Sequence, residues 1–320
     1  MEALQQRIDS GDVIILDGGT GTELQRRGVP MHGVAWSAAA LLTHSDVVRE
    51  VHEDYIRAGA DVIITNTFSA ARHTLEAAGM GDSVADANTR AVSLAKEARD
   101  VAAADRSVYI AGSVSTFFPG LQPELLPSAE QARASYSEQA QLLEQAGVDF
   151  LILEMMRDVE QSAYAIEAAV STGLPTWVCF TCKIDDGRQV RLFDSVDETF
   201  AESLESLLDP GASVAFVMHT DVDDTTPALR VLRQRWGGQL GAYAHSGGFF
   251  MPDWQFDDVI SPADYLVRAQ EWVGMGVQVV GGCCGTGPEH IRALRDGLPA
   301  RVPAAGRGAE GAPRQQNDRP

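Results

Sequence analysis

The sequence predicts an α/β fold, specifically a (β/α)8 TIM barrel, from three observations. The chain has 320 residues, which is long enough for one large α/β domain with a sizeable core. Eight short apolar runs alternate with longer segments of helical periodicity. Polar, glycine or cysteine residues follow each apolar run, at the end of the strands where a barrel carries its active site.

The apolar runs are expected to be parallel strands, because parallel strands covered by helices are buried on both faces. Between the ends of successive runs lie about 25 to 49 residues, which leaves room for a helix and loops each time. An open doubly wound sheet has the same alternation, but eight units in about 300 residues match the size of a barrel. The expected strands are Val13–Leu16, Val62–Thr65, Val108–Gly112, Phe150–Glu154, Thr176–Thr181, Ser213–Met218, Leu240–Tyr243 and Val277–Gly281.

Helical periodicity is clear in several of the intervening segments. Apolar residues at spacings of three and four follow Ser45 over Asp46–Ile56. Ser128 is expected to be the N-cap of another helix, because its hydroxyl can accept a hydrogen bond from a first-turn amide. Val159–Val170 and Ser261–Val273 show the same helical pattern.

The composition indicates one globular domain with a short tail. Residues 1–300 are expected to form a single barrel domain, whereas 301–320 are rich in Gly, Pro, Ala, Gln and Arg and are expected to be flexible. The formal charge of −20, without clustered basic residues, argues against nucleic-acid and anionic-membrane partners. The chain shows no membrane-spanning run and does not start like a signal peptide, so a cytoplasmic location is expected.

Adjacent cysteines form the sharpest motif. Cys283 and Cys284 lie between glycines, which permit unusual backbone angles and close approach to one ion. Zinc prefers sulfur and nitrogen ligands, and a catalytic zinc has three protein ligands and one open position. His219 or His245, each at the end of a neighbouring strand, is the expected third ligand. A buried inert cysteine pair is the alternative.

The other two cysteines are better explained by packing. Cys179 and Cys182 are three residues apart, which puts them on opposite faces of a strand. No second pair with zinc-finger spacing exists in the sequence. Both are therefore expected in the core.

Two carboxylates are candidate functional residues. Glu154 ends an otherwise apolar run, so its side chain is expected at the barrel mouth, where it could hold a substrate ammonium group or act as a base. Capping of a neighbouring helix is the alternative role. Asp17 begins the stretch Asp17-Gly18-Gly19-Thr20-Gly21, which we interpret as a tight turn that places Asp17 in the pocket.

These residues resemble the homocysteine S-methyltransferase family of zinc-dependent (β/α)8-barrel enzymes, over about residues 10–295. The resemblance implies that Cys283 and Cys284 bind Zn²⁺, that Glu154 and Asp17 are catalytic residues holding the amino-acid substrate, and that Gly18 and Thr65 line its pocket. The motifs that carry it are Leu16-Asp17-Gly18-Gly19-Thr20-Gly21-Thr22-Glu23-Leu24, Trp36-Ser37, Ala58-Gly59-Ala60-Asp61, Thr65-Asn66-Thr67-Phe68, Ala111-Gly112-Ser113, Glu154 and Gly281-Gly282-Cys283-Cys284-Gly285.

The sequence departs from the family at two strand ends. The family's third zinc ligand is the cysteine of a Gly-x-Asn-Cys motif, which here is Phe216-Val217-Met218-His219. His219 therefore occupies the ligand position, and two thiolates plus one imidazole would make the zinc site neutral. The family's Tyr-Pro-Asn is replaced by Tyr243-Ala244-His245.

The resemblance implies methyl transfer from a sulfonium or ammonium donor to a zinc-activated thiol. The donor would be of the S-methylmethionine, S-adenosylmethionine or betaine type, and the acceptor homocysteine, giving methionine. Alternatives are a different thiol acceptor and a noncatalytic binding relative. A lysine-dependent aldolase using Lys183, one of two lysines, is a further alternative, although Lys183 is expected in an exposed loop. The oligomeric state is left open.

Overall fold

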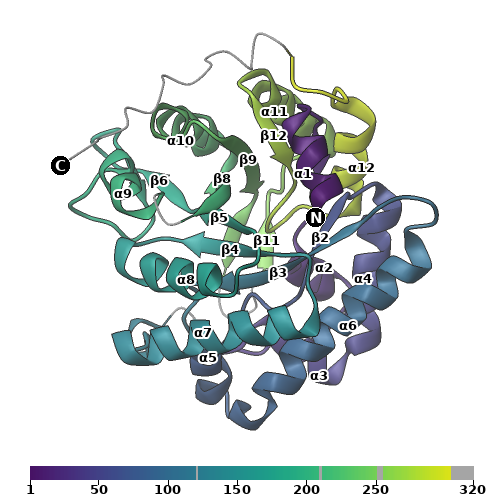
Figure 1. Cartoon of the computed structure of the whole chain (residues 1–320), viewed down its shortest axis with the longest axis vertical. Helices are drawn as coiled ribbons and strands as arrows, with labels where there is room; N and C mark the ends of the chain where they lie inside the picture. Colours follow the sequence, from purple (N-terminus) through teal and green to yellow (C-terminus); the bar gives the residue numbers. More distant parts are fainter. Residues whose placement is uncertain (120–121, 209–210, 251–254, 304–320) are drawn as a thin grey trace, which may run out of the picture.

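Eight parallel strands form the centre of the molecule. The computed structural model describes residues 1–119, 122–208, 211–250 and 255–303. The strand order is β1–β12–β9–β8–β5–β4–β3–β2. A parallel bridge between Leu16 and Val62 joins the first and second strands, so the sheet closes on itself. The predicted barrel is confirmed, and helices surround it on the outside (Figure 1).

All eight predicted strands coincide with barrel strands, with small differences at their ends. The largest are in β3, which continues beyond Gly112 to Ser115, and in β8, which continues beyond Met218 to Asp221. The barrel strands are β1 (Ile14–Ile15), β2 (Val62–Ile64), β3 (Tyr109–Ser115), β4 (Phe150–Met156), β5 (Thr176–Phe180), β8 (Ala212–Asp221), β9 (Gln239–His245) and β12 (Val277–Val280). Two hairpins are added to the barrel, β6 (Cys182–Ile184) with β7 (Val190–Leu192) and β10 (Gly248–Phe250) with β11 (Gln255–Asp257).

The helices follow the expected periodicity closely. Ser128 is the N-cap of α7 and forms a capping box with Gln131, as predicted for Ser128, whereas α4 begins at Ser45 itself. The α-helices are α1 (Glu2–Asp9), α2 (Thr20–Arg26), α3 (Ala40–Thr43), α4 (Ser45–Ala58), α5 (Arg72–Ala77), α6 (Val84–Ala102), α7 (Ala129–Ala146), α8 (Val159–Ser171), α9 (Phe200–Leu207), α10 (Val222–Arg235), α11 (Pro262–Gly274) and α12 (Pro288–Gly297). Short 3-10 helices are η1 (Ser37–Ala39), η2 (Gly81–Ser83) and η4 (Pro123–Leu125).

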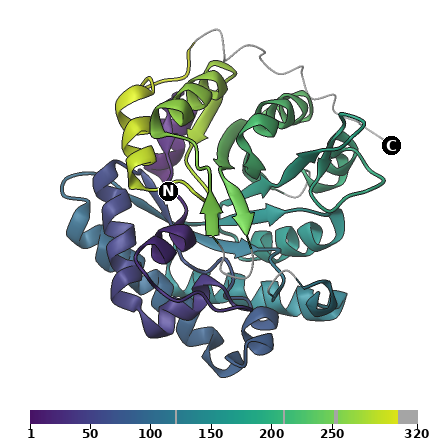
Figure 2. The same ribbon diagram turned by 180° about the vertical axis from the view of Figure 1, so that it is seen from behind.

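Alternation along the strands divides the core into two shells. In β4, Phe150 and Ile152 belong to the cluster inside the barrel, whereas Leu151 and Leu153 pack with the surrounding helices. Ile8 of α1 joins the inner cluster, so α1 covers one end of the barrel. The β10–β11 hairpin lies at the opposite end, as the two views show (Figures 1 and 2). Glu154 continues the inward series, which directs it toward this open end.

Large aromatic side chains fill one side of the barrel interior. The rings of Phe150 and Trp177 have centroids 4.1 Å apart, and those of Trp177 and Phe216 are 5.4 Å apart. Phe216 lies against Gly241, where an added Cβ would be 1.9 Å from the ring. A glycine is therefore required at 241, and the Phe216 ring supports Tyr243, whose centroid is 5.6 Å away.

The end of the described chain packs beside its beginning. Val302 donates a main-chain hydrogen bond to the carbonyl of Gly11 at 2.9 Å, and Arg301 pairs with Asp12. Residues 304–320 of the predicted tail lie outside the described residues, so the tail stays a prediction. Within the part of the chain that the structure describes, no helix combines the length and apolarity needed to cross a membrane.

His52 of α4 is an isolated titratable group in the core. Its side chain is fully buried, and among the described residues neither ring nitrogen has a hydrogen-bond partner. Burial lowers the pKa of His52 from 6.5 to about 4, because an imidazolium there would lose its hydration. The folded protein therefore keeps His52 neutral at pH values where the unfolded chain protonates it.

We predict that this histidine weakens the fold as the pH falls from about 6.5 to 4. In that window the unfolded state binds a proton that the folded state does not, so the free energy of unfolding should fall by up to about 3 kcal/mol at the acidic end. Urea unfolding of the wild type and His52→Leu across this range measures the effect. As the pH falls, the free energy of unfolding of the wild type should decrease relative to that of His52→Leu. Parallel curves would contradict the prediction.

Candidate active site

A register shift in β4 positions Glu154. Pairing between β4 and β5 shifts between Leu153 and Met156, which leaves an extra residue in β4. Met155, inside this bulge, has a φ of 54°, a left-handed conformation uncommon for a side-chain-bearing residue. Bulges near active sites redirect side chains. This one sits directly after the carboxylate at the barrel mouth.

A second bulge, in β8, positions His219. Pairing between β8 and β9 shifts between Met218 and Asp221, and His219 has a φ of 42°. The residue expected as a metal ligand thus has the same backbone conformation as the residue after Glu154. Trp36, on the far wall of the same pocket, has a φ of 44°. Non-glycine residues with positive φ therefore lie at or beside this site, as strained residues do at functional sites.

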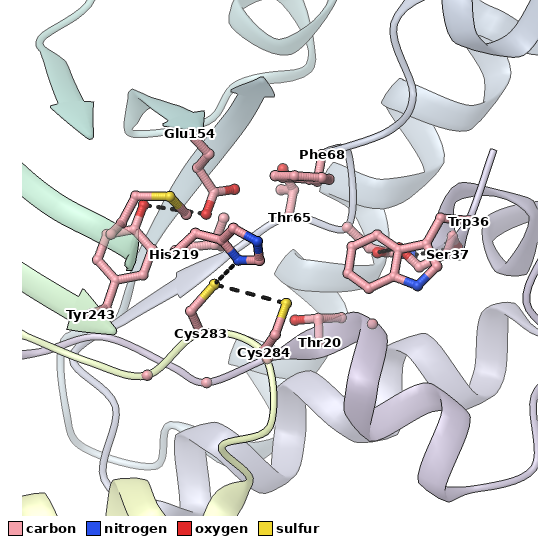
Figure 3. Close-up of a pocket in the computed structure, with 17 residues that line it drawn as sticks. Thr20, Trp36, Ser37, Thr65, Phe68, Glu154, His219, Tyr243, Cys283 and Cys284 are labelled. Carbon is pink, nitrogen blue, oxygen red and sulfur yellow. Dashed lines mark hydrogen bonds between the residues drawn. The ribbon is translucent and has the colours of Figure 1, made fainter. Parts of the chain in front are cut away.

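The three side chains of a possible metal site meet at the barrel mouth. His219 Nδ1 is 3.5 Å from Cys283 Sγ, and Cys283 Sγ is 4.0 Å from Cys284 Sγ. All three ligand atoms lie within 4.8 Å of one another (Figure 3). His245 is outside this group, although its ring centroid is 4.8 Å from that of His219. Of the two histidines considered from the sequence, the geometry favours His219.

The cysteine loop is held on several sides. Main-chain hydrogen bonds run from Cys283 to the carbonyl of Ala244 at 3.0 Å and from Gly282 to that of Asp17 at 3.0 Å. Gly285 has a φ of +84°, and a Cβ there would be 2.1 Å from the Ser246 carbonyl oxygen. The glycine is therefore needed for both reasons, and the two thiols have little freedom to separate.

The thiol of Cys283 resists ionisation in this environment. The hydrogen bond with Cys284, followed by burial, raises the pKa of the Cys283 thiol well above its ordinary value. Cys284 is 7% exposed. Two thiolates can coexist here only beside a compensating positive charge.

Glu154 is buried and held by two hydroxyl groups. Ser113 Oγ donates to Glu154 Oε2, and Tyr243 OH donates to Glu154 Oε1 at 3.2 Å. Burial raises the pKa of Glu154, while these two hydrogen bonds oppose the rise. Among the described residues, no lysine or arginine forms an ion pair with Glu154, so this buried and fixed carboxylate is suited to receive a cation from a ligand.

Asp17 lies beneath the pocket and does not line it. Its Oδ2 accepts a hydrogen bond from the Ile64 amide at 2.8 Å, and among the described residues Oδ1 has no partner. Burial, with a contribution from the charge of Glu154, raises the pKa of Asp17 well above its ordinary value. The predicted tight turn after Asp17 is in fact the start of α2, with Gly19 as its N-cap.

A pocket opens at the barrel mouth, beside Glu154 and the thiol cluster. Gly18 and Thr65, both predicted from the resemblance, are among its lining residues. Opposite the cysteines, Trp36 and Phe68 form an aromatic wall, with ring centroids 5.6 Å apart and nearly perpendicular planes (Figure 3). No lysine or arginine is among the residues described as lining this pocket.

The other two cysteines and Lys183 are not among the residues that line this pocket. Cys179 belongs to the cluster inside the barrel and Cys182 to the outer shell, as their spacing predicted. Lys183 is in strand β6 and not in an exposed loop, and its ammonium group lies 5.5 Å from the centroid of the Phe193 ring. It is not among the residues that line the pocket.

Some site residues were not identified from the sequence as functional. Tyr243 and Ser113 lie in noted motifs, but their hydrogen bonds to Glu154 depend on which face of the strand they occupy. Inward alternation along β9 was the available signal for Tyr243. Asn66 holds the first residue of η1 through two hydrogen bonds with Ser37, of 2.9 and 3.0 Å. Nothing in the local sequence indicated that pairing.

Comparison with known proteins places this geometry in context. The model of the family described as homocysteine S-methyltransferase matches residues 14–298. A selenocysteine methyltransferase of Astragalus bisulcatus is 30% identical, with 89% of this chain and 92% of that protein covered. A betaine–homocysteine S-methyltransferase 1 of Bos taurus is 29% identical, with 93% and 75% covered. The metallated form of the homocysteine methyltransferase MmuM from Escherichia coli has a TM-score of 0.74 at 27% identity, covering 92% of this chain and 99% of that one.

Proposed function

The chain belongs to the homocysteine S-methyltransferase family, and we propose that it transfers a methyl group from a sulfonium or ammonium donor to homocysteine, giving methionine. The observation that carries the proposal is the convergence of His219, Cys283 and Cys284 beside the buried Glu154. A thiol-binding cluster and an ammonium-binding carboxylate at one barrel mouth match the two ends of a thiol amino acid.

The cluster has the donor set and the spacing of a zinc site. Zinc bound tetrahedrally with Zn–S of about 2.3 Å and Zn–N of about 2.0 Å requires sulfurs about 3.8 Å apart and sulfur and nitrogen about 3.5 Å apart. The two sulfurs here are 4.0 Å apart, and Cys283 Sγ is 3.5 Å from His219 Nδ1. The third pair, His219 with Cys284, lies within 4.8 Å. His219, Cys283 and Cys284 would hold the ion and leave a fourth position open. When bound, zinc supplies a Lewis acid that lowers the pKa of the acceptor thiol.

Glu154 would hold the amino end of the acceptor. An ammonium group beside this carboxylate would offset the burial that raises its pKa. Ser113 and Tyr243 keep Glu154 in one orientation, so the acceptor's sulfur end is directed consistently. Orientation of this kind lowers the barrier for bond formation.

The aromatic wall would hold the donor. Trp36 and Phe68 present ring surfaces to a pocket whose described lining contains no lysine or arginine, and cations are attracted to such faces. The acceptor thiol gives its proton to solvent, and its sulfur forms a bond to the donor's methyl carbon. The donor's C–S or C–N bond breaks with its electron pair retained, releasing a neutral sulfide or amine.

The alternatives are less well supported by these contacts. A different thiol acceptor would use the same cluster but need not have an amino group, which would leave Glu154 without a role. A noncatalytic relative would have no need for all three ligand side chains. The aldolase alternative is disfavoured because Lys183 lies outside the pocket.

We predict that His219 is required for zinc binding and that His245 is not. Competition with a chromogenic chelator should show about one zinc per chain in the wild type and an affinity lower by at least about 100-fold in His219→Ala, because one of three ligands is lost. His245→Ala is the matched control and should bind zinc within a few-fold of the wild type. If His219→Ala kept full zinc affinity, or if both variants lost the same amount, the assignment of His219 as the zinc ligand would be wrong.

We predict that the zinc-loaded protein forms methionine from homocysteine with S-methylmethionine or betaine as donor, as measured by mass spectrometry. Glu154→Gln should raise KM for homocysteine by about 10- to 100-fold, because a charge-assisted hydrogen bond is weakened. Glu160→Gln, an exposed position on α8, is the control and should leave KM unchanged. Absence of methionine with every sulfonium and ammonium donor tried would refute the proposed function.

A further inference from the structure

A buried methionine lies between the two bulges of the site. Met218, in β8, is fully buried and directly precedes His219. Its sulfur accepts hydrogen bonds from the Met155 amide and from Thr181 Oγ1, each at 3.3 Å. The first of these donors is the main chain of the β4 bulge, next to Glu154. Met218 therefore contacts the strand that carries the carboxylate while it is part of the strand that carries the candidate metal ligand.

The contact with Met155 has a physical reason. Regular pairing with β5 is interrupted across the β4 bulge, and a buried amide that loses its strand partner needs another acceptor. The thioether is a weak acceptor, but it lies where the strand partner is missing. On the other side, Thr116 Oγ1 donates to the Met155 carbonyl. The bulge is thus held at both polar groups of Met155.

The main chain of Met218 is fixed as well. Its carbonyl accepts a hydrogen bond from Thr220 Oγ1 at 3.0 Å, and the same hydroxyl oxygen accepts one from the Cys182 amide at 2.9 Å. These bonds hold the β8 bulge on both sides of His219. One end of Met218 thus supports the His219 backbone, and the other supports the backbone next to Glu154.

We propose that Met218 is a positioning residue that sets Glu154 and His219 relative to each other. The inference rests on the proposed function, in which Glu154 holds the amino end of the acceptor and His219 belongs to the metal cluster at its sulfur end. An apolar side chain of the same size would preserve packing but leave the Met155 amide without its acceptor. The β4 bulge would then be free to shift, and with it the carboxylate.

The hydrogen bond can be observed without any enzymatic activity. Glu154-Met155 is the only Glu-Met pair in the sequence, so labelling with carbonyl-¹³C glutamate and ¹⁵N methionine isolates the Met155 amide as one NMR signal. In Met218→Leu this signal should move, and its hydrogen exchange should accelerate by about 5- to 10-fold. Met218→Gln, whose side-chain oxygen can accept the bond, should restore slow exchange. Met156→Leu, a buried methionine in the outer shell, is the matched control and should not accelerate it.

Activity then tests the positioning role. Met218→Leu should raise KM for the acceptor by about 5- to 30-fold with a smaller change in kcat, and Met218→Gln should recover most of that loss. An unchanged Met155 signal in Met218→Leu would overturn the proposed contact, whatever the protein's activity. A changed signal with unchanged acceptor KM would overturn the positioning role. Failure of the wild type to transfer methyl groups would instead refute the proposed function and leave the NMR result standing.

Discussion

The alternation of side chains along closed parallel strands is the constraint on which the rest of this structure depends. Closure forces every second residue into a narrow interior, and Phe150, Trp177, Phe216 and Tyr243 fill one side of it. The same alternation carries Glu154 into the mouth. At that level the two bulges interrupt the alternation, and they do so beside Glu154 and at His219. The same in–out alternation of side chains thus builds the core and leads up to the site, which lies where the bulges in β4 and β8 interrupt it.

The site concentrates groups that are costly to bury together. Two carboxyl groups and two thiols lie in one region, and burial raises the pKa of Asp17 and Glu154, while the neighbouring thiol does so for Cys283. Under the proposed function, a metal at the sulfurs and an ammonium group at Glu154 would offset these costs. The protein would contribute acceptors and π faces, and its ligands would contribute the positive charge.

Much of the fold was predictable because it depends on local pattern. The strands, the Ser128 cap and the cysteine loop follow from apolar runs, a hydroxyl at a helix start, and glycines around two thiols. The bulges were not predictable, because a register shift arises from pairing between strands and leaves no mark in the composition of either. Without them, the left-handed backbone of His219 and Met155 could not be foreseen, nor could the role of Met218. Asp17 was expected in the pocket, but it is buried, accepts a hydrogen bond from the Ile64 amide and is not among the lining residues.

The two bulges have a consequence for the size of the acceptor. Both belong to the same rigid barrel, so the gap between the carboxylate and the thiol cluster has a set length. Under the proposed function, the acceptor is bound at its nitrogen by Glu154 and at its sulfur by the metal cluster. The carbon chain between these two atoms must therefore span that gap. A chain shorter by one methylene would leave one end without its partner, which costs more than the lost apolar contact alone. The barrel mouth would then select among thiol amino acids by the length of the carbon chain between nitrogen and sulfur.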